Sequence, residues 1–278
     1  MTTAPPQTET TLAALLIPTH PDELPFVMLA KALDGGEGEV LRELRATARQ
    51  GHTPVALLDG SGPGFHEALL SVAEQFAAPA PGGTGRLTFP RLTCGLLAVA
   101  SGGWNGRDPG RIRSETQRIL RLSDARARPP GSAGRWCGRL AARLMSSLPD
   151  SGPVVVEVLV EASLEAYSEG MSSPYRRLRR GAVWYRDHPN ADGNPKLGLI
   201  HLSRHYGTPV SAAARAHAEH HLVRALLADV ADAYSASSGV VPRAHRADRP
   251  LLLIDNARAP AARRLLQSVL HDRADQTD

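Results

Sequence analysis

Lysine is almost missing from this chain of 278 residues, in which only Lys31 and Lys196 occur. Arginine therefore supplies nearly all of the positive charge, and the formal net charge is +4 with a pI of about 9.4. Together with the abundance of alanine, glycine and proline, this bias is typical of a GC-rich bacterial genome. The basic pI by itself is therefore weak support for a nucleic-acid partner.

Cysteine and aromatic residues are also scarce. Cys94 and Cys137 are the only cysteines, which is too few for a disulfide framework, and they lack the spacing of a metal site. Aromatic residues make up 4% of the chain and hydrophobic residues 42%, so a core must consist mainly of leucine, valine and alanine. A reduced, cytoplasmic protein fits this composition best.

Long apolar runs are absent as well. The stretch Leu12–Ile17 is too short for the core of a signal peptide, and no basic residue precedes it. No run approaches the roughly 20 apolar residues that a membrane-spanning helix needs. We therefore expect no contact with a membrane.

Short apolar runs in a largely helical chain define the expected organisation. Phe26–Ala30, Val55–Leu58 and Leu251–Ile254 have the composition of parallel strands that are buried on both faces. We predict an α/β fold with a parallel sheet and a large helical insertion. Residues 1–24 form a flexible tail, 25–100 the first half of the core, 101–245 the mostly helical insertion, and 246–278 the last strand and helix.

Polar caps and prolines mark where several helices are expected to begin. These starts are at Pro90, Asp108-Pro109, Asn194-Pro195, Ser211 and Pro260. The stretch Val154–Val160 is ambiguous, because its β-branched residues favour a strand, whereas glutamates spaced four residues apart favour one face of a helix. We predict a helix there.

Two glycine-rich loops each lie between a predicted strand and a predicted helix. In such loops, successive backbone N–H groups can surround a phosphate at the positive end of a helix dipole. The first loop contains Gly35, Gly36 and Gly38, and the second contains Gly60, Gly62 and Gly64.

Neither loop has the lysine, followed by serine or threonine, that completes a phosphate loop of the usual type. The first loop has Glu39 and Val40 at these positions, and the second has Phe65 and His66. An acidic residue there repels a triphosphate, since a unit-charge contact at 4 Å costs about 4 kcal/mol at an effective dielectric near 20. The second loop is neutral apart from Asp59.

The strand Leu251–Ile254 ends at Asp255. A buried parallel strand that ends in aspartate delivers a carboxylate to the carboxyl edge of the sheet. Nucleotide-binding α/β proteins use such a carboxylate to hold Mg²⁺ against the phosphates. Asp255 is therefore the expected Mg²⁺ ligand, and ATP is the expected nucleotide.

The order of these elements resembles that of P-loop NTPases, in particular bacterial ATPases of the AAA/STAND type, over roughly residues 24–270. The segments Gly85–Ala98 and Pro250–Pro260 are similar to helical and Walker B segments of that family. The resemblance implies that the first loop takes the Walker A position and that Asp255 is the Walker B aspartate.

This chain departs from the family pattern in three respects. The Walker A lysine is absent, and Asn256 stands where many members have an acid that activates the attacking water. The chain also ends before the sensor residue and helical lid of the family. The resemblance thus implies an NTPase-like fold without a competent hydrolase.

Arginines are concentrated in two stretches. Ten lie between Arg107 and Arg143, against three acidic residues, and four of the five residues Arg176–Arg180 are arginine. These stretches could contact nucleic acid, nucleotide phosphates or an acidic partner, or form solvated helix faces. His217 and His221 have the i, i+4 spacing of some zinc ligands, but we expect both on the solvent side of their helix.

The sequence therefore predicts a degenerate nucleotide-binding module, or pseudo-ATPase, with a role in regulation or assembly. No nucleophile motif is visible, so no catalytic residue is assigned; an active form would be an ATPase. The expected partner is another protein or a further copy of the chain. Two alternatives stay open: an interaction subunit that has lost nucleotide binding, and a nucleic-acid-associated factor that uses its arginines.

Overall fold

The computed structural model describes residues 37–51, 53–59, 64–78, 87–101, 108–123, 173–189, 191–207, 211–234 and 250–275. The chain divides into two compact units, Met1–Val40 and Leu41–Asp278. Only residues 37–40 of the first unit are described, so the fold presented below is that of the second unit. The strand expected at Phe26–Ala30 and the helix expected at Val154–Val160 lie outside the described residues.

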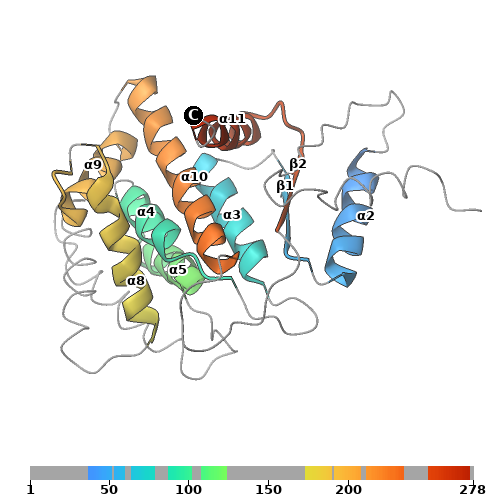
Figure 1. Cartoon of the computed structure of the whole chain (residues 1–278), viewed down its shortest axis with the longest axis horizontal. Helices are drawn as coiled ribbons and strands as arrows, with labels where there is room; N and C mark the ends of the chain where they lie inside the picture. The colour runs from blue at the N-terminus through green and yellow to red at the C-terminus, as the bar shows by residue number, and fades with distance from the viewer. Residues whose placement is uncertain are drawn as a thin grey trace, which may run out of the picture. The chain divides into compact units, whose positions relative to one another are not determined.

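Two short strands form a parallel sheet (Figure 1). β1 (Val55–Asp59) pairs with β2 (Leu251–Asp255) in a register that joins Val55 to Leu251 and Asp59 to Asp255. Both strands occur where the apolar runs predict them. With the surrounding helices they confirm a mixed α/β fold.

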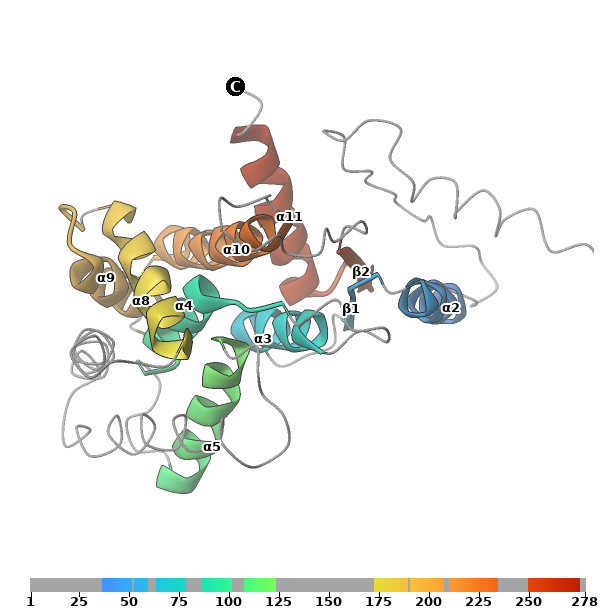
Figure 2. The same cartoon turned by 60° about the horizontal axis from the view of Figure 1, so that its bottom comes forward.

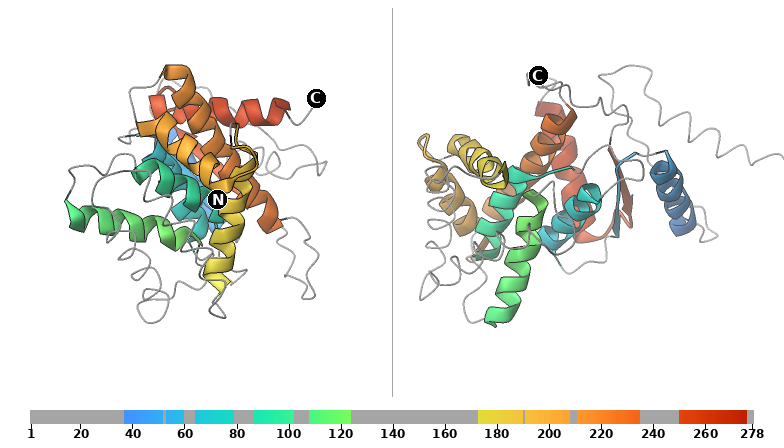
Figure 3. Two further views of the ribbon diagram at one scale, coloured as in Figure 1. Left: turned by 90° about the vertical axis from the view of Figure 1, so that its left-hand side faces the viewer. Right: turned by 90° about the horizontal axis from the view of Figure 1, so that it is seen from below.

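The two faces of this sheet have different surroundings. Ala56 and Leu58 belong to the main hydrophobic core, and the residues paired with them on β2 pack against it. Helices α3 (Phe65–Ala77) and α11 (Pro260–Asp275) lie on this side of the sheet (Figures 2 and 3). Because side chains alternate along a strand, Asp59 and Asp255 belong to the opposite face.

Gln75 of α3 occupies the outer edge of β1. Its side-chain amide donates to the carbonyl oxygen of Leu57 at 2.9 Å and accepts from the N–H of Leu57 at 3.0 Å. Arg45 of α2 (Glu37–Gln50) donates to the same amide oxygen at 2.9 Å. The amide thus satisfies backbone groups that a third strand would otherwise pair, so the sheet ends at this point of β1 without unsatisfied groups.

Helix α4 (Pro90–Ser101) lies at the centre of the helical part. Every residue from Leu92 to Ser101 is buried, as expected for a helix that other helices surround. Its neighbours are α5 (Pro109–Leu120), α8 (Ser173–Trp184), α9 (Pro195–Gly207) and α10 (Ala212–Tyr234). The 3₁₀ turns η1 (Arg121–Ser123) and η2 (Tyr185–Asp187) extend α5 and α8. The Arg-rich α8 is a helix that the sequence analysis did not predict.

The expected helix starts are confirmed for α4, α5, α9, α10 and α11. The side chains of Asp108, Asn194 and Ser211 each accept a hydrogen bond from a first-turn backbone N–H, at 2.9, 2.9 and 3.3 Å. These bonds satisfy donors that a helix leaves without an internal partner. Local sequence therefore determines these boundaries.

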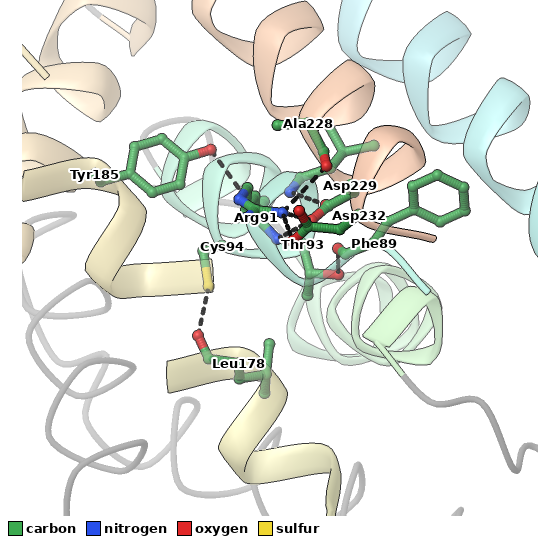
Figure 4. A network of polar contacts seen from close by, with 10 residues as sticks. Phe89, Arg91, Thr93, Cys94, Leu178, Tyr185, Ala228, Asp229 and Asp232 are labelled. Carbon is green, nitrogen blue, oxygen red and sulfur yellow. Dashed lines mark hydrogen bonds and ion pairs between the residues drawn. The ribbon is translucent and has the colours of Figure 1, made fainter. Parts of the chain in front are cut away.

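A polar network ties the start of α4 to α10 (Figure 4). Asp229, which is 2% exposed, accepts from the backbone N–H of Leu92 and from the guanidinium of Arg91, both at 3.0 Å. Arg91 also pairs with Asp232 at 2.7 Å, and the hydroxyl of Tyr185 donates to the carbonyl oxygen of Arg91 at 3.0 Å. Burial raises the pKa of Asp229 to about 7, against the opposing effect of these donors.

Candidate functional site at the strand ends

The carboxyl ends of the two strands bring Asp59 and Asp255 together. They are register partners in neighbouring parallel strands, so their Cα atoms lie about 5 Å apart and their side chains point to the same face. Asp59 is exposed, and Asp255 is half-buried. Two carboxylates at this separation repel each other and can share a divalent cation, since Mg²⁺ and Ca²⁺ prefer oxygen ligands.

The second glycine-rich loop connects β1 to α3. Gly60 and Gly62 lie outside the described residues, whereas Gly64 is the N-cap of α3, in extended backbone with φ −173° and ψ 163°. The carbonyl oxygen of Gly64 accepts from the N–H of Ala68 at 3.0 Å. The positive end of the α3 dipole therefore stands at the end of the loop that begins beside Asp255.

The residues at the lysine and serine positions of this loop are held by packing. Phe65 is buried in the core and 3% exposed, so it cannot contact a phosphate. His66 is half-buried, and its Nδ1 lies 3.2 Å from the hydroxyl of Tyr206. Neither side chain replaces the permanent positive charge of a lysine, so a phosphate at this loop would have to be bound by backbone N–H groups.

The first glycine-rich loop is partly helical. Gly38 is the second residue of α2, because this helix begins at Glu37. Gly35 and Gly36 lie outside the part of the chain that the structure describes. Of the two loops, the second follows a described strand, β1, and β1 pairs with the strand that carries Asp255.

Asn256 follows Asp255 and has a positive φ of 50°. Asparagine tolerates this left-handed conformation better than most residues, because its short polar side chain can form local hydrogen bonds. The carbonyl oxygen of Asn256 accepts from the N–H of Ala259 at 2.9 Å and closes the turn into α11. The backbone conformation thus gives a local reason for asparagine where the family resemblance implies an acid.

A second group of potential metal ligands lies at the first turn of α3. Within the described residues, His66, Glu67 and Glu115 each offer a ligand atom within 4.8 Å of the other two. However, Glu67 already accepts from Arg118 at 3.0 Å, and Arg118 forms a bidentate pair with Glu74 at 2.6 and 2.7 Å. These bonds join α3 to α5, so we interpret the group as part of that helix contact.

All but one of the arginines of the described stretches fall into two kinds; the exception, Arg179, is half-buried. Arg118 joins α3 to α5, and Arg177 donates to the carbonyl oxygen of Ser123 at 2.9 Å. Both therefore hold the fold together. The exposed arginines of the two predicted stretches are Arg111, Arg113, Arg121, Arg176 and Arg180. Arg107 and the arginines from Arg126 to Arg143 lie outside the described residues.

The expectation that His217 and His221 face solvent is wrong for His221. His217 is exposed, but only 6% of His221 is exposed, and its ring centroid lies 4.8 Å from that of Trp184. The face of α10 that carries His221 is covered by η2 and its neighbours. The periodicity of α10 alone cannot reveal this covering, because it comes from residues far away in the sequence.

A surface hollow of about 370 Å³ lies between α10 and α11. Its lining includes His220, Arg264 and His271, and the guanidinium of Arg264 donates to Glu219 at 2.9 Å. No lining residue comes from the strand ends or from the glycine-rich loops. The hollow is therefore separate from the candidate site.

Comparisons with protein-family models, with curated proteins and with solved structures found no match to this chain. None of the described helices is long and apolar enough to cross a bilayer. A functional assignment therefore depends on the geometry of the candidate sites.

Proposed function

We propose that this chain is a nucleotide-binding module of the P-loop type that has lost ATP hydrolysis and acts in regulation or assembly. The pairing of β1 with β2 is the observation that supports this proposal. In P-loop proteins a glycine-rich loop joins a strand to a helix, and an aspartate at a strand end binds Mg²⁺. Here β1, the second loop and α3 correspond to the strand, glycine-rich loop and helix, and Asp255 corresponds to the aspartate that binds Mg²⁺.

Binding would use backbone N–H groups of the second loop, up to Gly64, for the phosphates and Asp255 for Mg²⁺. Asp59 adds a second carboxylate at the same edge of the sheet. The metal ion would offset the repulsion between these carboxylates and the phosphates. Because no lysine balances the charge of the nucleotide, we expect weak binding that requires Mg²⁺.

Hydrolysis is not expected from this site. Asn256 follows Asp255, and an amide side chain cannot take a proton from water as a general base does. The buried Phe65 cannot stabilise charge on the transferred phosphoryl group. The nucleotide would therefore be a ligand that favours one conformation or assembly of the protein.

Thermal unfolding with nucleotide tests the proposal. For a Kd of about 1 mM, Mg-ATP at about 10 mM adds about 1.4 kcal/mol to the free energy of unfolding, which raises the midpoint by a few degrees. Replacing Mg²⁺ with EDTA should abolish this increase. Asp255→Asn should remove most of it, whereas Asp187→Asn, which changes an exposed carboxylate of η2, should leave it intact.

Two results would count against this function. No shift at about 10 mM Mg-ATP would favour the alternative of an interaction subunit that has kept only the scaffold. An equal shift in the wild type and in Asp255→Asn would mean that the nucleotide binds away from the strand ends. Unfolding of both variants without ligand controls for changes in the fold itself.

The exposed arginines of α8 support a second candidate, a nucleic-acid-associated role. Arg176 and Arg180 lie four residues apart on one face of the helix and are both exposed. Retention on duplex DNA should then fall steeply with salt, and the double variant Arg176→Ala/Arg180→Ala should elute earlier. Arg186→Ala, an exposed arginine paired with Asp187 at 3.3 Å, is the matched control.

A further inference from the structure

Five of the eleven histidines of the chain gather where α9, α10 and the turn after η2 meet. We call them the histidine cluster: His188, His201, His205, His217 and His221. His188 is central, with its ring centroid 4.6 Å from that of His221, 6.0 Å from that of His217 and 6.3 Å from that of His205. The residues come from three elements, so the cluster exists only in the folded chain.

Each of the two helices contributes a pair with i, i+4 spacing. His201 and His205 lie on α9 with ring centroids 6.2 Å apart, and His217 and His221 lie on α10 with centroids 6.4 Å apart. This spacing places two imidazoles on one face of a helix, one turn apart, which is how helices present paired histidines to a metal ion. His188 lies between the two pairs.

The hydrogen bonding of His188 leaves one nitrogen available as a ligand. Its Nδ1 lies 2.8 Å from the carbonyl oxygen of Pro189. A carbonyl oxygen only accepts, so Nδ1 must carry the proton, and Nε2 is left with its lone pair. Histidines that bind metals are commonly oriented in this way, with the other ring nitrogen donating to a carbonyl or carboxylate.

Several nitrogens of the cluster are buried without a hydrogen-bond partner among the described residues. They are Nε2 of His188, Nε2 of His221 and Nδ1 of His205. His188 is 3% exposed and His221 is 6% exposed. Buried polar atoms are normally paired, and those that are not call for an explanation such as an ion. Burial lowers the pKa of His188 and of His221, which keeps these rings neutral, as a ligand must be.

The cluster is open to solvent on one side. His217 is exposed, and His201 and His205 are half-buried, so an ion can enter from the α9 and α10 surface. On the inner side, the rings of Trp184 and Tyr185 lie 4.8 and 5.6 Å from that of His221. The cluster therefore has packed aromatic rings on its inner side, and its solvent side carries histidine side chains that have room to rotate.

Small ring rotations are needed to close a coordination shell. Two imidazoles on one tetrahedral ion, with metal–nitrogen bonds of about 2 Å, have ring centroids roughly 5 Å apart. The separations of 4.6–6.3 Å around His188 bracket this value. Within the described residues, the group whose three ligand atoms lie within 4.8 Å of one another is His66, Glu67 and Glu115. Three nitrogens of the histidine cluster do not come this close, so its rings must rotate before they can share one ion.

We propose that the histidine cluster binds one divalent transition-metal ion, with His188, His217 and His221 as ligands and His205 completing the shell. An all-imidazole set favours Zn²⁺, Ni²⁺ or Cu²⁺ over Mg²⁺ and Ca²⁺, which prefer oxygen. The bound ion fastens α9 and the turn after η2 to α10. No residue of the cluster belongs to the strand ends, so this inference does not depend on nucleotide binding.

Calorimetric titration of the full, untagged chain with Zn²⁺ and with Ni²⁺ tests the proposal. We expect one ion per chain and a rise in the unfolding midpoint that Asp255→Asn retains, whereas any rise with Mg²⁺ depends on Asp255. His217→Ala changes an exposed residue and should fold normally. It should weaken binding at least about tenfold, since the loss of a residue that merely orients a ligand already costs about 10- to 100-fold. His188→Ala should weaken binding by at least as much.

Two control variants separate this site from the other histidines. His66→Ala removes the histidine that lies near Glu67 and Glu115 at the first turn of α3. His271→Ala removes an exposed histidine whose ring lies 4.9 Å from that of His220. Both should bind the metal as the wild type does. The proposal is overturned if titration gives no saturable binding, or if His66→Ala or His271→Ala weakens binding as much as His217→Ala does.

Discussion

Asp59 and Asp255 are paired across the two strands of the sheet, at the end of a register that begins with Val55 and Leu251. They are far apart in the sequence, yet both occupy the carboxyl edge of neighbouring strands and the same face. Any charge at one of them acts directly on the other. Their pairing gives the candidate site its chemical character, because two adjacent carboxylates favour a divalent cation.

If these two carboxylates share Mg²⁺, their effects on stability should be coupled. Mg²⁺ should raise the free energy of unfolding of the wild type, and Asp59→Asn and Asp255→Asn should each remove most of that rise. The double variant should lose no more than either single variant, since residues that act as one site are not additive. Urea unfolding with Mg²⁺ or EDTA measures this coupling; additive losses would mean two independent sites.

Asp229 should be far more important for stability than Asp232, although both carboxylates bind Arg91. The side chain of Asp229 is 0% exposed and that of Asp232 is 64% exposed. Asp229→Ala leaves Arg91 and the first turn of α4 without their buried acceptor, which should cost about 3 kcal/mol or more. Asp232→Ala should cost at most about 1 kcal/mol. Chemical denaturation at neutral pH checks both values, and equal losses would contradict the role of Asp229 as the buried acceptor that joins α10 to the start of α4.

The contribution of His221 to the free energy of unfolding should fall as the pH is lowered from about 7 toward 5. Burial and the nearby charges of His188 and Arg224 lower the pKa of His221 to about 3, whereas the unfolded chain protonates this ring near pH 6.5. Below that pH the unfolded chain binds a proton that the folded chain does not, so the free energy of unfolding decreases as the pH falls toward the pKa of the folded state. Asp229 acts in the opposite direction, because its pKa is raised to about 7.

A variant of His221 isolates its share of this dependence. Asp229 is present in both the wild type and His221→Phe, so its effect cancels when the two are compared. The wild type should therefore lose more stability than His221→Phe between about pH 7.5 and pH 5.5. Urea unfolding at the two pH values gives the comparison. Equal losses would show that the buried imidazole of His221 is not a source of the pH dependence.

Gly181 allows α8 to approach the start of α4 closely. A Cβ at this position would overlap the carbonyl group of Pro90, which is backbone and cannot rotate away. Gly181→Ala should therefore destabilise the protein by about 1–3 kcal/mol or more. Gly51→Ala is the control, because its added Cβ would meet backbone oxygens at an ordinary 3.6 Å, and it should stay within about 1 kcal/mol of the wild type. Denaturation midpoints that fail to separate the two variants would argue against this close contact.

Local features of the fold could be predicted because their causes are local. The apolar runs that end at Asp59 and Asp255 form strands, and Asp108 and Ser211 cap the helices that follow them. The candidate site could be predicted only in part. Asp255 was expected to be a metal ligand, but no local pattern indicates that Asp59 is its register partner, because a register is a contact between distant segments.

The sequence by itself determined the positions of β1 and β2, the starts of most described helices and the lack of a lysine in either glycine-rich loop. Only the tertiary structure decided that β1 and β2 are neighbours, that Phe65 is buried in the core and that His188 joins the histidines of α9 and α10. Periodicity and capping act over a few residues, so the sequence displays them directly. Pairing, burial and clustering depend on surfaces that meet only when the chain packs.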